Sequence, residues 1–162
     1  MREEGAIRSI GVIGTPGCGK TTLCKALGLP TRSVKSLAES NACLGELDTD
    51  GSHPVDVERL AKLFSKPLEL TLIDGHLAHH LPVDALIVVR CEPNELEKRL
   101  TARGYSAHKI QSNVEVEMLG GPWPELIGDN RPIKEGTEGV LEWIKSGCPS
   151  LATPEGAIDW LS

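Results

Sequence analysis

The stretch GTPGCGKTT, from Gly14 to Thr22, lies between an apolar, β-rich run at 7–13 and a segment at 21–27 with apolar residues at helical spacing. It matches the pattern G-x-x-x-x-G-K-[S/T] in the strand–loop–helix context that the pattern requires. Glycines let backbone N–H groups turn toward phosphate oxygens, and a helix N-terminus adds partial positive charge. Lys20 would reach the β- and γ-phosphates, and Thr21 would offer a hydroxyl to Mg²⁺. The stretch therefore predicts a nucleotide-phosphate site.

Cys18 lies inside this loop and allows two interpretations. The helix N-terminus that follows it would make its thiol more acidic, as in reactive cysteines. Alternatively, it is a small, buried filler residue, which is common for a lone cysteine. The second interpretation is favoured.

The rest of the chain alternates apolar, β-rich runs with amphipathic helical patterns. Strands are expected at 7–13, 68–73, 85–89 and, as a short last strand, 125–127. Helices are expected at 21–27, 33–40 and 55–64, from Pro93 to about 103, after a cap at Ser106, and around Val140 to Ile144 before Gly147. Such alternation favours an α/β fold with a parallel sheet. Because no repeat or long linker interrupts it, residues 1–162 are expected to form one domain.

Composition narrows the function classes further. The net charge of −6 and the small number of aromatic residues (three Trp, one Tyr and one Phe) argue against general nucleic-acid binding. No apolar run approaches the roughly 20 residues that span a membrane, and the acidic start is unlike a signal peptide. The five cysteines are odd in number and include no CxxC pair, which is typical of free thiols in a reducing cytosol. A cytoplasmic location is therefore expected.

Histidines and a carboxylate follow the second predicted strand. Asp74 ends the run LTLID, where an Asp of nucleotide-binding proteins of this type helps to hold Mg²⁺; a turn-capping Asp is the alternative. His76 would orient water or a phosphate acceptor, since it titrates near neutrality. His79 and His80 raise the idea of a metal site, but no Cys/His spacing supports zinc. Solvated loop histidines are the favoured interpretation for both.

Two arginines are candidates for phosphate contacts. Arg103 ends a predicted helix, where it would either reach over a nucleotide or only satisfy the helix dipole. Arg131 follows the last predicted strand, and ligands of open α/β sheets bind beyond the strand carboxyl ends. It is therefore a candidate for contact with the base or the phosphates.

Three elements together resemble one family: the phosphate loop, Asp74-Gly75-His76, and Arg103-Gly104-Tyr105 with Lys109, Asn113 and Glu117. This is the adenylate kinase isoenzyme six family, which includes archaeal adenylate kinases. The resemblance covers residues 8 to about 146. It implies a three-layer P-loop nucleoside monophosphate kinase fold with a five-stranded parallel sheet. A monophosphate-binding region would lie at about 33–55 and a short lid at about 102–112.

The resemblance also implies an activity. Members of the family transfer the γ-phosphoryl group of ATP to AMP or a related monophosphate with Mg²⁺, hydrolyse ATP, and assist small-subunit rRNA maturation through a small-subunit ribosomal protein. The residues implied in ATP binding are Gly17, Cys18, Gly19, Lys20, Thr21, Thr22, Arg103 and Arg131. The implied catalytic residues are Lys20, Asp74, His76 and Arg103, with Thr21 and Asp74 at the metal.

One position departs from the family pattern. The family often carries a basic residue where this chain has Glu39, and Lys35 is a candidate replacement. The departure therefore concerns the phosphoryl acceptor and leaves the prediction of ATP binding unchanged. A different small acceptor is an alternative. The alternative function is an ATP-driven assembly factor that binds and releases a ribosomal protein, a role that suits an acidic chain with a basic partner.

Overall fold

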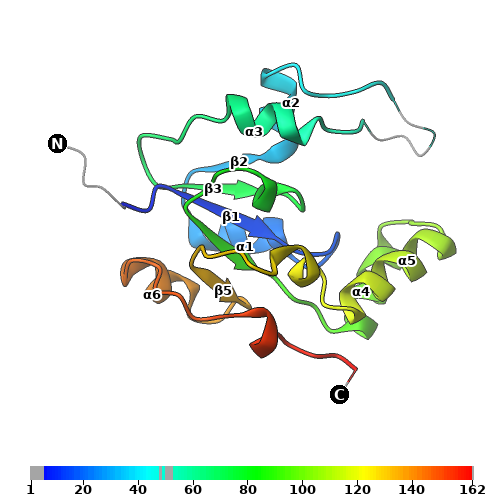
Figure 1. The fold of residues 1–162 in the computed structure, drawn as a ribbon. Helices are drawn as coiled ribbons and strands as arrows, with labels where there is room; N and C mark the ends of the chain where they lie inside the picture. Colours follow the sequence, from blue (N-terminus) through cyan, green and yellow to red (C-terminus); the bar gives the residue numbers. More distant parts are fainter. Residues whose placement is uncertain (1–5, 48, 50–52, 162) are drawn as a thin grey trace.

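Five short strands form one parallel sheet in the computed structural model, which describes residues 6–47, 49 and 53–161 (Figure 1). The strands are β1 (Ser9–Ile13), β2 (Thr31–Ser33), β3 (Thr71–Asp74), β4 (Ala85–Val88) and β5 (Ile133–Glu135), in the order β2-β3-β1-β4-β5. Every residue of β1 and β4 is buried, as expected for parallel strands covered on both faces. The predicted α/β fold with a five-stranded parallel sheet is confirmed.

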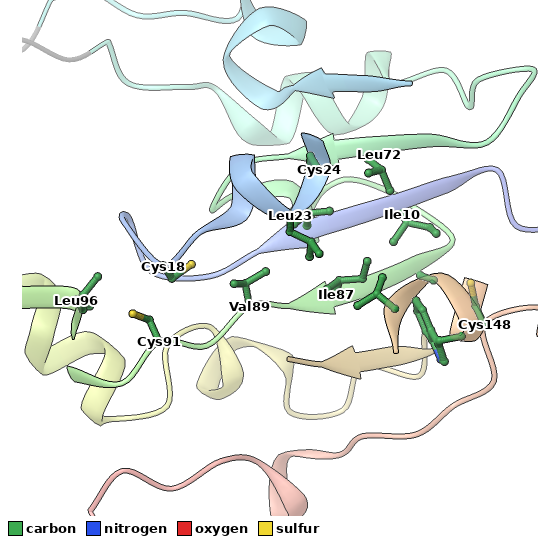
Figure 2. Close-up of a cluster of buried hydrophobic side chains, with 14 of the residues drawn as sticks. Ile10, Cys18, Leu23, Cys24, Leu72, Ile87, Val89, Cys91, Leu96 and Cys148 are labelled. Atoms are coloured by element: carbon green, nitrogen blue, oxygen red, sulfur yellow. The ribbon is translucent and has the colours of Figure 1, made fainter. Parts of the chain in front are cut away.

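Helices cover both faces of the sheet and make three layers (Figure 1). The α-helices are α1 (Lys20–Leu27), α2 (Val34–Ser40), α3 (Val57–Leu63), α4 (Pro93–Ala102), α5 (Ala107–Met118) and α6 (Val140–Lys145). Short 3-10 helices are η1 (Ala78–His80), η2 (Trp123–Leu126) and η3 (Pro154–Gly156). One core packs alternate strand residues such as Ile10 and Ile87 against α1, α4 and α6 (Figure 2). The opposite core packs Ile13, Ile73 and Leu86 against α2, α3, η1 and η2.

The structure corrects the last predicted strand. Residues 123–126 form the 3-10 helix η2, and the strand at this edge of the sheet is β5, eight residues further along. Pro122 and Pro124 explain the difference, because proline fixes φ and cannot donate a ladder hydrogen bond. β5 and the unpredicted β2 are each three residues long, too short for a periodic sequence signal.

Helix α5 buries its apolar side chains only partly. Ser106 caps it as expected, accepting a hydrogen bond from the backbone N–H of Lys109. Ile110, Val114 and Met118 are only half-buried, however, and the one fully buried residue of the helix is Glu117. A buried carboxylate needs partners, and these lie around the phosphate loop described below.

Among the residues that the structure describes, no helix combines the length and the apolar character needed to cross a bilayer.

Candidate nucleotide site

The phosphate loop joins the end of β1 to the start of α1 in a turn that only glycine permits at two positions. A Cβ on Gly14 would lie 2.6 Å from the carbonyl oxygen of Val89 and 2.6 Å from the sulfur of Cys18. Gly17 has φ of +88°, and a Cβ there would lie 2.8 Å from Leu100. The loop is thus held close against β4 and α4, with its backbone path determined by these approaches.

Helix α1 begins at Lys20 with its first N–H groups free of a side-chain cap, since the N-cap residue is Gly19. Uncapped N–H groups at a helix start attract anions. The ammonium of Lys20 folds back over the loop and donates to the carbonyl oxygens of Gly14 (2.8 Å) and Thr15 (3.4 Å). Donors and positive charge therefore surround the space where a phosphate would lie.

Thr21 and Asp74 meet at the carboxyl edge of the sheet. Asp74 ends β3, in register with Val12 of β1, so its side chain lies beside the loop that follows β1. The Thr21 hydroxyl donates to a carboxylate oxygen of Asp74 at 3.0 Å. A hydroxyl and a carboxylate are oxygen ligands of the kind that Mg²⁺ takes beside nucleotide phosphates. These two residues fit a magnesium ion that also binds the nucleotide.

His76 lies two residues beyond Asp74, at a cavity of about 430 Å³. The cavity is lined by Ser33, Val34, Lys35, His53, Val55, Asp74, Gly75, His76 and Leu77. It thus draws on part of the monophosphate-binding region expected at 33–55, of which residues 48 and 50–52 lie outside the described residues. Glu39 is not among its lining residues, whereas Lys35 is. Loss of hydration lowers the pKa of His76, and the Lys20 ammonium lowers it further.

A second cavity, of about 550 Å³, lies on the other side of the phosphate loop. It is lined by Gly17, Cys18, Gly19, Thr22, Leu23, Ala26, Arg99, Arg103 and Thr137. Both cavities have the size of typical small-molecule sites. Arg103, the exposed C-cap residue of α4, lines this cavity together with residues of the phosphate loop.

Arg99 is a cation of this site that the sequence analysis missed. Its guanidinium donates to the carbonyl oxygen of Gly17 at 3.3 Å and lies near Gly19. In sequence, Glu95 and Arg99 form an ordinary i, i+4 pair on a helix surface. In the structure, Nε of Arg99 lies 3.5 Å from Oε1 of Glu95. Only the packing of α4 against the loop distinguishes Arg99 from a surface cation.

The Cys18 side chain is buried, and burial raises the pKa of its thiol to about 11 despite the opposing Lys20 charge. Its thiol is therefore protonated at neutral pH. The structure favours the small filler residue over the reactive thiol.

Arg131 is not brought to the phosphate loop. It precedes β5, contrary to the expectation that it follows the last strand, and lines a groove beside α3. Its guanidinium donates to Asp129 and to the carbonyl oxygens of His79 (2.7 Å) and Leu81 (2.8 Å). These contacts make Arg131 a brace between the segment before β4 and the segment before β5. It lines neither of the two cavities beside the loop.

Glu117 supports the phosphate loop from behind. Its side chain is fully buried and accepts hydrogen bonds from the Thr15 hydroxyl (2.7 Å), the Arg90 Nε (2.8 Å) and the Trp160 indole N–H (2.8 Å). The Thr15 contact connects α5 directly to the loop. The sequence resemblance included Glu117 without assigning it a role, although it lies seven residues after Ile110 and three after Val114, on the same face of the helix.

Arg90 extends these contacts toward the C-terminal segment, residues 148–161. It also donates to Glu135 at 3.0 Å and to the carbonyl oxygen of Ile158 at 2.9 Å. Glu135 in turn accepts from the Trp123 indole at 2.6 Å and from the Ile158 N–H at 2.9 Å. The Arg90 guanidinium thus pairs with both carboxylates, whose other hydrogen bonds come from neutral donors of the phosphate loop, the segment after β4, η2 and the C-terminal segment.

Comparison with known proteins agrees with this geometry. A family model described as "AAA domain" matches residues 10–120. Proteins named "Putative adenylate kinase" from Thermococcus onnurineus and Methanocaldococcus jannaschii are 35% and 31% identical to the chain, each over 93% of it and over 90% and 92% of their own lengths.

Solved structures are similar in fold. A sugar kinase from Janibacter sp. HTCC2649 superposes with a TM-score of 0.52 at 17% identity, covering 94% of this chain and 99% of that one. A "putative kinase" from Chloroflexus aurantiacus gives a TM-score of 0.51 at 18% identity, covering 89% of this chain and all of that one.

Proposed function

This chain belongs to the P-loop kinase family of the archaeal adenylate kinase relatives, and on that premise we propose that it transfers the γ-phosphoryl group of ATP to AMP or a related nucleoside monophosphate. The observation that carries the proposal is the Thr21–Asp74 pair with a cavity on either side of the phosphate loop. A phosphoryl transfer enzyme needs a donor site and an acceptor site that meet at the transferred group.

The cavity of about 550 Å³ is the proposed ATP side. The backbone N–H groups at the start of α1 bind the phosphates, and Lys20 exchanges its contacts with the loop carbonyls for contacts with the β- and γ-phosphates. Arg103 and Arg99 approach from α4 and supply positive charge where the transferring group accumulates negative charge. Mg²⁺, held by Thr21 and Asp74, would neutralise the phosphate oxygens and align them.

The cavity of about 430 Å³ is the proposed acceptor side. Lys35 lines it and would bind the acceptor phosphate in place of the basic residue that Glu39 replaces. His76 lines the acceptor cavity, and its lowered pKa favours a neutral imidazole at pH 7. A neutral imidazole can orient the acceptor oxygen, or a water molecule, by a hydrogen bond.

Water entering the same cavity would give ATP hydrolysis, which is the basis of the second candidate function. Glu39 stands where the family often has a basic residue, which weakens the support for tight binding of a nucleoside monophosphate. The net charge of −6 suits a basic protein partner. An ATP-driven factor that binds and releases a small-subunit ribosomal protein during rRNA maturation is consistent with both features.

The experiment incubates purified protein with Mg²⁺ and ATP, with and without AMP, and measures ADP and free phosphate. AMP-dependent formation of ADP without free phosphate is expected for the kinase. Equal release of free phosphate with and without AMP would overturn the kinase proposal and leave the ATPase function. Capture of purified small-subunit ribosomal proteins, with and without ATP, then tests the second candidate. The second candidate is contradicted if no ribosomal protein is captured, or if ATP does not change which proteins are captured.

A further inference from the structure

Two histidines and one carboxylate converge beside a groove that is also lined by α3. His79 and His80 lie in η1, and Glu125 lies in η2, 46 residues after His79. Oε2 of Glu125 contacts Nε2 of His79 and lies 3.5 Å from Nε2 of His80. The three ligand atoms all lie within 4.8 Å of one another. Two short helices from different parts of the chain thus present three metal-binding atoms to one point.

This arrangement changes the interpretation of both histidines. The sequence favoured solvated loop residues, but His79 is 7% exposed, so that expectation is wrong for it. The two rings lie side by side, with centroids 4.1 Å apart and planes tilted by 37°. Nδ1 of His79 is buried without a hydrogen-bond partner in the described part of the chain, so Glu125 is the polar contact that orients this ring.

The ligand types select a class of ion. Two imidazole nitrogens and one carboxylate oxygen, with a fourth position open, are the ligand set of many three-ligand zinc sites. Hard ions such as Mg²⁺ and Ca²⁺ prefer sets made of oxygen alone.

The surroundings allow an ion to enter and to complete its coordination. A groove of about 600 Å³ runs between α3 and the two histidines, and both His80 and Glu125 are accessible from solvent. Lys62 and Arg131 are cations that line this groove, as does the carboxylate of Glu58. The charge of Arg131 is balanced by Asp129, which accepts from both Nε and Nη2. A water molecule in the groove would supply the fourth ligand.

We propose that His79, His80 and Glu125 form a binding site for a divalent transition metal ion, with Zn²⁺ as the best-matched ion, separate from the magnesium site of Thr21 and Asp74. The ion would join η1, which follows Asp74 and His76 in the chain, to η2. Because the site assembles only in the folded chain, binding stabilises the folded state.

The test uses metal-stripped full-length protein titrated with Zn²⁺ by calorimetry in the presence of excess Mg²⁺. One zinc ion per chain is expected. His80→Ala and Glu125→Gln are each expected to raise the Kd for Zn²⁺ by about tenfold or more. Losses of metal affinity of this size are seen even for residues that only support metal ligands. The two substitutions are on exposed side chains and avoid buried His79, whose loss could disturb folding. His108→Ala, at an exposed histidine of α5, is the matched control and should leave the Kd unchanged.

Cobalt and thermal measurements separate this site from the five cysteines. Co²⁺ bound to nitrogen and oxygen ligands gives visible d–d bands without the near-ultraviolet thiolate band that cysteine binding produces. Zn²⁺ should raise the Tm of the wild type and of His108→Ala but not of His80→Ala. The proposal would be overturned by a thiolate band in the Co²⁺ spectrum. It would also be overturned if His108→Ala lost as much Zn²⁺ affinity as His80→Ala, or if neither His80→Ala nor Glu125→Gln changed that affinity.

Discussion

The hydroxyl of Thr15, inside the phosphate loop, donates a 2.7 Å hydrogen bond to Oε1 of Glu117, which lies 102 residues later, and both side chains are buried. The second oxygen of Glu117 accepts from Arg90 and Trp160. The loop is therefore supported by helix α5, by the segment after β4 and by the C-terminal segment together. Figure 1 shows this segment running back toward α4 and α5.

Replacing Glu117 by Gln should destabilise the protein. The change leaves the buried Arg90 guanidinium without one of its two carboxylate partners, and breaking a buried pair in this way costs about 3–5 kcal/mol. Urea unfolding measures the loss in free energy of unfolding. ATP titration at a temperature where the variant is folded should give a higher Kd. Glu115→Gln, an exposed change on the same helix, should be neutral. Equal stability of the two variants would contradict the supporting role of Glu117.

Replacing Trp160 by Phe should remove one donor to the Glu117 carboxylate while keeping an aromatic ring near Arg90. Trp160 lies with its ring centroid 5.7 Å from the Arg90 guanidinium carbon. Loss of a hydrogen bond to a charged group costs about 1.5–3 kcal/mol, so a lower Tm is expected by scanning calorimetry. Leu161→Ala, at the exposed neighbour, is the control. An unchanged Tm in Trp160→Phe would mean that the C-terminal segment does not stabilise the network.

Asp74→Asn should lower kcat by about 10²-fold or more while changing ATP affinity less, because in the proposed mechanism the carboxylate holds the metal at the transferring group. His76→Ala should likewise slow turnover more than it weakens binding. Coupled-assay kinetics and direct ATP binding give the two quantities. Glu97→Gln, on the exposed face of α4, is the charge-matched control. Equal losses of kcat and affinity would mean that these residues only shape the pocket.

The stability of the protein should fall at alkaline pH. Burial raises the pKa of the Cys18 and Cys148 thiols to about 11 and that of Cys24 to about 12, from an ordinary value of 9.0. A raised folded-state pKa gives stability that is complete below pH 9 and is lost as the pH rises through the folded-state values, because the unfolded thiols ionise first.

Urea unfolding at pH 8 and pH 10.5 measures this loss, and Cys24→Ala should reduce its slope. At pH 8 the folded thiols should also resist iodoacetamide, whereas the unfolded chain reacts. Rapid alkylation of Cys18 in the folded protein would contradict the raised pKa.

Local sequence determined the phosphate loop, the flanking strand and helix, and the carboxylate that ends β3. These features follow from backbone requirements and short-range periodicity, as at Gly17, where the positive φ of the turn favours glycine. The parallel sheet also follows, because alternating buried strands and helices admit few other arrangements.

Only the tertiary structure decided where the long-range polar contacts lie. Glu117 is a charged residue on the apolar face of its helix, Arg99 has the spacing of a surface ion pair, and His79 that of a loop histidine. The sequence shows none of their partners, each of which lies more than 40 residues away. Arg131 is the reverse case: the sequence made it a candidate for ligand contact, and the structure makes it a brace. The reason is that η2 forms where the last strand was predicted. A buried polar side chain must find its hydrogen bonds wherever the packed elements place them, and local sequence patterns carry no record of that placement.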